Sequence, residues 1–136
     1  MAHEGNSSCY PLELLFGISW TFRGSEFQNQ AVFDAAVTEF QDPKFRDVWR
    51  PKEVVLLAAH IRVSPDVAWY LTDEHPTIEF GADNGHSFTA GELLYKVHNA
   101  FVANLRQMDH QYFEGFTLDE NQEPSKPPLY NLDLGS

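Results

Sequence analysis

Residues 88–118 read FTAGELLYKVHNAFVANLRQMDHQYFEGFTL, a pattern typical of a helix that runs directly into a strand. Thr89 and Glu92 have the Thr-x-x-Glu spacing of a capping box, in which each side chain bonds a free backbone amide of the first turn. Apolar residues then return every three or four positions, at Leu94, Val97, Phe101, Leu105 and Met108. We therefore expect an amphipathic helix of about 19 residues whose opposite side faces water.

Two segments alternate apolar residues with others at a period of two, which is typical of strands with one buried face. One of them follows the helix and covers residues 112–118. The other covers residues 12–23, where every even position is apolar. Its apolar residues are Leu12, Leu14, Phe16, Ile18, Trp20 and Phe22. We expect a single uninterrupted strand there.

A second helix is expected between these segments. Ser25 and Gln28 repeat the capping-box spacing and mark its start. Pro43 ends it near Gln41, because proline cannot continue the hydrogen-bonding pattern of a helix. Its single apolar face is formed by Val32, Phe33, Ala36, Val37 and Phe40. This helix, like the first, should cover one side of a sheet.

The remaining strands are expected in the middle of the chain. Residues 54–63 fit a buried strand, although a short helix also suits their composition. The Ser64-Pro65-Asp66 turn should bring residues 67–71 back to pair with that strand. Residues 77–82 form the next expected strand, and Asn84-Gly85 predicts a hairpin with a return strand over 86–88.

These elements predict an α+β fold. It is a two-layer sandwich, with two helices packed on one face of a mainly antiparallel sheet of about five strands. We expect a single domain over residues 11–118, a flexible leader over 1–10 and a polar tail over 119–136. The tail alternates again over 129–134, so it can add a strand to this sheet or to that of a partner. We expect the tail or a second subunit to cover part of the other face of the sheet.

The composition argues against several classes of function. The formal net charge is −11, whereas nucleic-acid binding depends on a basic surface, so we expect no nucleic-acid partner. No apolar run is long enough for a membrane span, and the start of the chain lacks the pattern of a secretory signal. Cys9 is the only cysteine, so a thiolate metal cluster is not expected. A cytoplasmic location is the resulting expectation.

The bases are unevenly distributed. Residues 44–52 contain four of the nine Lys and Arg residues, whereas residues 63–95 contain six acidic residues and no Lys or Arg. Guanidinium groups beside an aromatic ring can bind carboxylates, so this basic stretch is a candidate surface for contact with a partner. Its partner-binding candidates are Lys44, Arg46, Trp49 and Arg50. The alternative is a solvated loop in which Phe45 and Trp49 pack into the core. Contact between the basic stretch and the acidic half of another copy would produce a homo-oligomer.

Histidines supply the candidate catalytic residues, since imidazole titrates near neutral pH. His98 lies at the edge of the apolar side of the helix, and His110 ends the helix. Together with Glu114 and His60 they could form an acid–base pair or an open metal site. In the alternative, His98 makes one structural hydrogen bond and His110 complements the helix dipole. The sequence has no HExxH, paired-cysteine or glycine-rich phosphate motif, so we expect neither a metal nor a cofactor.

Two functions are consistent with these features. The first is a small acidic protein-interaction module without catalysis that binds a protein partner or a second copy. One version of it is an inhibitor that neutralises a basic partner, because charge complementarity speeds association. The second is a small enzyme or ligand-binding protein with an aromatic pocket between sheet and helix, using His98, His110 and Glu114.

Overall fold

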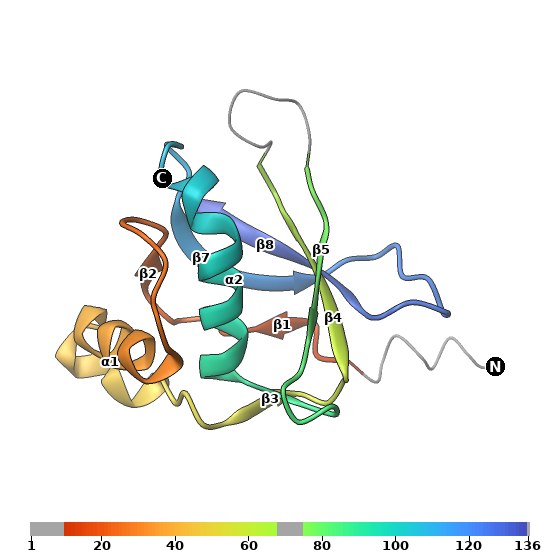
Figure 1. Cartoon of the computed structure of the whole chain (residues 1–136), viewed down its shortest axis with the longest axis horizontal. Coiled ribbons are helices and arrows are strands. Elements are labelled where there is room, and N and C mark those ends of the chain that lie inside the picture. Colours follow the sequence, from red (N-terminus) through yellow and green to blue (C-terminus); the bar gives the residue numbers. More distant parts are fainter. Residues whose placement is uncertain (1–9, 68–74, 136) are drawn as a thin grey trace.

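The computed structural model describes residues 10–67 and 75–135. Its larger sheet has the strand order β1-β7-β8-β4-β5, and β2 also pairs with β7 (Figure 1). The strands β4 and β8 run parallel, whereas all other pairs in this sheet are antiparallel. The α+β class and the mainly antiparallel sheet are therefore confirmed. The bounds are Glu13–Leu14 for β1, Trp20–Thr21 for β2, His60–Pro65 for β4, Ile78–Gly81 for β5, Tyr112–Leu118 for β7 and Leu129–Gly135 for β8.

The other elements lie around this sheet. A two-stranded sheet joins β3 (Val54–Leu56) to β6 (Phe88–Thr89). Helix α2 (Ala90–Leu105) crosses the sheet in front of β7 and β8, and α1 (Gln30–Phe40) lies beside it, packed against α2 (Figure 1). A 3-10 helix, η2 (Pro43–Val48), follows α1. The core lies between α2 and the sheet.

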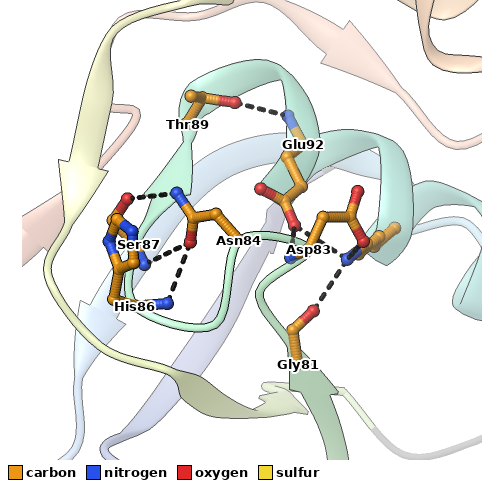
Figure 2. A network of polar contacts seen from close by, with 8 residues as sticks. Gly81, Asp83, Asn84, His86, Ser87, Thr89 and Glu92 are labelled. Atoms are coloured by element: carbon orange, nitrogen blue, oxygen red, sulfur yellow. Dashed lines mark hydrogen bonds and ion pairs between the residues drawn. The ribbon is translucent and has the colours of Figure 1, made fainter.

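Half of the predicted capping box forms at the start of α2. The hydroxyl of Thr89 accepts from the amide of Glu92 at 3.2 Å, as expected. The Glu92 carboxylate does not return to the cap. It accepts from the amide of Asp83 at 2.8 Å and from Lys96 Nζ at 2.8 Å, which ties the helix to the preceding turn (Figure 2). Lys96 also contacts Asp83 and the carbonyl of Gly81, so one ammonium group closes the turn after β5.

Helix α2 is shorter and more buried than expected. It has 16 residues, and ten of them are buried, including Glu92 and His98. The expected wet side is partly covered because residues 25–27 cross it. The carbonyl of Phe27 accepts from Asn99 Nδ2 at 3.0 Å, and the carbonyl of Ser25 contacts a ring nitrogen of His98. Residues 25–27 therefore cover part of this side, whereas Ala103 and Arg106 remain exposed, as expected.

The uninterrupted strand over residues 12–23 was a wrong prediction. The chain forms β1 and β2, which both pair with β7, and it turns between them at Leu15 (φ 57°) and Gly17 (φ 85°). The turn changes which side chains face inward. Leu14, Ile18, Trp20 and Phe22 are buried as the alternation predicts, whereas Leu12 is 72% exposed and Phe16 is 50% exposed.

Helix α1 also begins later than expected. Its N-cap is Asn29, whose side chain accepts from the amide of Val32 at 2.9 Å, so the Ser25 cap was wrong. The predicted end at Gln41 is confirmed. Gln41 is buried, and its amide group exchanges hydrogen bonds with both backbone groups of Ser19, at 2.9 and 2.6 Å. One side chain thus fastens the end of α1 to the loop before β2.

The middle of the chain divides between the two sheets. The expected strand over 54–63 forms as two strands, β3 and β4, which are separated by residues 57–59 and belong to different sheets. The turn at Asn84-Gly85 forms, with Gly85 at φ 82° and Asn84 Oδ1 accepting from the amides of His86 and Ser87 (Figure 2). It does not join a hairpin, since β5 pairs with β4 and β6 pairs with β3. The expected return strand over 67–71 lies largely outside the described residues.

The predicted tail contains a central strand. β8 lies between β7 and β4, and its residues Tyr130, Leu132 and Leu134 are buried. The alternation over 129–134 therefore predicted the strand correctly, and the sheet includes residues beyond 118, because β8 joins β7 to β4. The strand completes this sheet instead of covering its other face.

Candidate functional site

The larger sheet has one face against α2 and one that no described helix covers (Figure 1). The strand register assigns residues to these faces. The pairs Val63 with Tyr130 and Phe116 with Leu132 are buried against the helix. The residues that precede and follow them along each strand point to the other face. We call that side the acidic face, after its charged residues: Glu13, Arg62, Asp66, Glu79, Glu114 and Asp133.

Four carboxylates on the acidic face influence one another. Burial raises the pKa of Asp133, and the charges of Glu114 and Glu13 raise it further. Burial likewise raises the pKa of Asp66, with contributions from Asp133 and Glu114. Glu13 comes from β1, Glu114 from β7, Asp133 from β8 and Asp66 from the residue after β4. Four segments thus bring like charges together on one surface.

Hydrogen bonds fix two of these carboxylates. Asp133 Oδ2 accepts from the Thr117 hydroxyl at 2.5 Å, across the β7–β8 ladder. Asp66 Oδ1 accepts from the amide of Leu134 at 3.2 Å, so this carboxylate is bound to the backbone of β8. A carboxylate that is already oriented loses less conformational entropy when it binds a cation.

Glycine positions the third carboxylate. The Glu114 side chain lies across Gly135 on the neighbouring strand, and a Cβ atom at Gly135 would overlap the Glu114 carboxylate. The absence of a side chain at this point in β8 is what lets Glu114 lie close to the sheet. The position of a charged group on this face therefore depends on a glycine of the neighbouring strand.

The positive groups on this face already have partners. Arg62 contacts Glu123 at 3.5 Å and donates to the carbonyl of Pro127 at 2.9 Å. His60 Nδ1 lies 3.3 Å from Glu79. Within residues 10–67 and 75–135, no ion pair involves Glu13, Asp66, Glu114 or Asp133. No positive group in the described part of the chain therefore compensates these four carboxylates.

The basic stretch is arranged differently from either expectation. Trp49 is only 4% exposed, and its indole donates to the carbonyl of Asp34 at 3.2 Å, so it anchors η2 to α1. Phe45, which was expected to pack inward if the loop were structural, is 57% exposed. Lys44, Arg46 and Arg50 are exposed and make no ion pair with the described residues.

The four candidate catalytic residues do not meet in one site. His98 is fully buried, whereas His60, His110 and Glu114 are exposed. His98 lies among aromatic rings, His60 pairs with Glu79, and Glu114 lies over Gly135. The expectation that His110 ends α2 was wrong, because the helix stops at Leu105. The described part of the chain contains no cluster of three or more His, Cys, Asp or Glu suited to a metal ion.

His98 is held by two hydrogen bonds that determine its protonation. The Trp20 indole, which can only donate, lies 3.2 Å from Nδ1. The carbonyl of Ser25, which can only accept, lies 3.0 Å from Nε2. His98 must therefore be neutral with its proton on Nε2. Rings of Trp20, Phe22, Phe27 and Phe33 surround it within 5.2–5.8 Å of its centroid, and burial lowers its pKa.

The sequence did not indicate the acidic face, although one signal was available. The alternation over 129–134 predicts a strand. If that strand is placed in the centre of the sheet, Asp133 lies beside the outward-facing residues of the two adjacent strands. The charge count by segment pointed instead to residues 63–95. These acids are dispersed, since Asp66 and Glu79 lie on the acidic face, whereas Asp83 and Glu92 bind Lys96.

Comparisons with family models, curated proteins and solved structures gave no match for this chain, so its function is argued from its residues. Among the described residues, no helix combines the length and the apolar character that crossing a membrane requires.

Proposed function

We propose that this protein is a small interaction module that binds a basic protein partner through the acidic face. An inhibitor that neutralises such a partner is the most specific version of this function. The observation that carries the proposal is the group of mutually repelling carboxylates, Glu13, Asp66, Glu114 and Asp133, on the sheet face that no described helix covers. A cationic partner would relieve their repulsion on binding, which adds to the favourable free energy of association.

The choice of a protein partner rests on the shape of this face. Its carboxylates are spread over four strands or strand ends, and a typical protein interface buries about 800 Å² on each partner. A phosphate backbone would be repelled by the same charges. A second copy presenting its own acidic face would be repelled as well, since the chain carries a formal charge of −11. These features favour a different protein with a basic surface.

The test compares the wild-type chain with a variant of the acidic face. The variant Glu13→Gln plus Glu114→Gln removes two exposed charges and keeps the side-chain size. The control Glu39→Gln plus Asp47→Asn removes two exposed charges from α1 and η2. Each protein is immobilised, exposed to native lysate, and eluted with a salt gradient before mass spectrometry. We expect the wild type and the control to retain the same basic protein, and the variant of the acidic face to lose it.

The retained protein is then expressed and titrated directly. Its association rate constant should fall steeply as ionic strength increases, because exposed charges are screened over about 10 Å at 0.1 M salt. Equal binding of this protein by the wild type and the variant of the acidic face would contradict the proposal. Retention that is insensitive to salt would contradict it too.

A further inference from the structure

A second surface lies where the β1–β2 turn meets η2. It contains a hollow of about 170 Å³. The buried residues Ile18, Trp49 and Ala90 line it. Its exposed lining includes Phe16 and Val48, which are 50% and 44% exposed. A cavity of about 150 Å³ is large enough for benzene, so the volume of this hollow, which Arg50 and Glu53 also line, is sufficient for a single aromatic side chain.

The backbone holds Phe16 in place at this hollow. The alternation of the sequence would bury Phe16, but the left-handed conformation of Leu15 (φ 57°) turns the chain between β1 and β2. The ring of Phe16 lies over Gly115, where a Cβ atom would come within 2.6 Å of Phe16 Cδ1. A leucine in the left-handed region is sterically disfavoured. The exposed ring is therefore fixed by a turn, by a glycine and by its packing.

Bases outnumber acids beside the hollow, in contrast to the acidic face. Arg50 lines it, and Lys44 and Arg46 lie on the same short helix as Val48. These three bases make no ion pair within the described part of the chain. Two acids lie among them, because Glu53 also lines the hollow and η2 carries Asp47.

We infer that this hollow docks an acidic peptide segment of a partner by receiving one aromatic side chain. Carboxylates on either side of that aromatic residue pair with Arg50 and the bases of η2. Interfaces commonly draw most of their affinity from one such buried anchor surrounded by weaker polar contacts. Guanidinium groups bind carboxylates through two parallel hydrogen bonds, so the contact depends on the orientation of both groups as well as on their charges. The inference is independent of the acidic face, since none of its four carboxylates lines the hollow.

The test uses a synthetic peptide in which phenylalanine lies between two pairs of acidic residues. The full chain, labelled with ¹⁵N, is titrated while the amide signals of Val48, Val55 and Ala90 are followed by NMR. Two further peptides replace phenylalanine by alanine, or the acidic residues by their amides. We expect saturable shifts at these three amides with the first peptide. The alanine peptide should bind at least about tenfold more weakly, as loss of a buried ring implies.

A charge reversal completes the test. Arg50→Glu should weaken binding of the acidic peptide about tenfold, whereas the same charge change at the exposed Lys126 should leave it unchanged. The double variant Glu13→Gln plus Glu114→Gln should bind the peptide as well as the wild type does, which separates this inference from the proposed function. Equal binding of the phenylalanine and alanine peptides would overturn it. So would shifts at the same amides that depend only on protein concentration, because a second copy would then occupy the hollow.

Discussion

At the scale of single residues, His98 shows how a polar group is accommodated in an aromatic core. A buried hydrogen-bonding group is costly unless it is paired, and both nitrogens of His98 are paired. Protonation would place an N–H group against the N–H group of Trp20, since the indole nitrogen cannot accept. The site therefore excludes the charged form of the ring by its geometry as well as by burial. Its role is structural.

This arrangement predicts that acid destabilises the protein. The pKa of His98 is lowered in the folded chain, whereas an unfolded histidine titrates near 6.5. The stabilisation is fully present above about pH 6.5 and is lost as the pH falls toward the folded pKa, because the unfolded chain then binds a proton that the folded chain rejects. Urea unfolding curves between about pH 7.5 and 5.5 should show the free energy of unfolding decreasing by up to about 1.4 kcal/mol per pH unit.

Two variants check the origin of this pH dependence. His98→Gln should flatten the dependence between about pH 7.5 and 5.5, even if its stability at pH 7.5 is lower. His86→Gln, which alters an exposed residue of the turn before β6, should retain the wild-type slope. If His98→Gln kept the full slope, another group would be responsible and the neutral state of His98 would lose its support.

Gly115 provides a second prediction at this scale. Its φ of 109° is rarely adopted by residues with a side chain, and a Cβ atom would overlap Phe16 and approach the carbonyl of Leu14 at 3.2 Å. Gly115→Ala should therefore lower the free energy of unfolding by about 2 kcal/mol or more. Gly24→Ala is the matched control, because Gly24 also has a positive φ but no atom lies within 4 Å of the added Cβ. Thermal unfolding of the two variants should show a clearly larger loss at position 115.

At the scale of elements, β8 determines whether the sheet is continuous. It bonds β7 on one side and β4 on the other, and its alternate residues pack against α2. Leu132→Ala should lower the free energy of unfolding by about 2–5 kcal/mol, since it creates a cavity in the core. Leu129→Ala removes the same atoms from a half-buried position, so it should cost much less. Chemical denaturation of both variants would test this, and equal losses would contradict the central role of the inward face.

Local signals in the sequence predicted many of these elements. The Thr89 cap, the end of α1 at Gln41 and the alternation of β8 each depend on residues close together in the chain. Their chemistry acts over one turn or one strand, so it can be recognised without knowing the fold. The inward positions of Trp20 and Phe22 were predicted for the same reason.

The features that were missed depend on residues far apart in the chain. The parallel pairing of β4 with β8 joins residues 62–65 to 129–132, and no local pattern specifies it. The positive φ of Leu15 could not be predicted, because leucine disfavours that conformation and tertiary packing imposes it. The acidic face was missed with them, since Glu114 and Asp133 become neighbours only after β8 inserts.

At the scale of the whole molecule, negative charge is concentrated on one surface at a cost in stability. The pKa of Asp133 is raised by burial and by its acidic neighbours, so ionisation of this carboxyl group is less favourable in the folded chain than in the unfolded chain. Removal of that charge should stabilise the protein while weakening any contact with a basic partner. Such a conflict between stability and activity is common where a surface is used for binding.

Asp133→Asn tests this conflict. The amide oxygen can still accept from Thr117, so the variant should gain a few tenths to about 1 kcal/mol in the free energy of unfolding at pH 7 and low salt. The gain should shrink as salt is raised toward about 0.5 M, because screening removes the repulsion in the wild type. Asp47→Asn, an exposed site on η2, should change stability by less than about 0.5 kcal/mol. An unstable Asp133→Asn would show that the hydrogen bond outweighs the repulsion.

The position of β8 also affects how the protein is made. A ribosome synthesises β4 and β7 before the strand that joins them, because β8 is the last strand in chain order. Until residues 129–135 emerge, the nascent chain presents unpaired strand edges and the apolar side chains that β8 will later meet. Folding of the main sheet should therefore be completed only after residues 129–135 have emerged, and until then the nascent chain should bind chaperones that shield exposed strands.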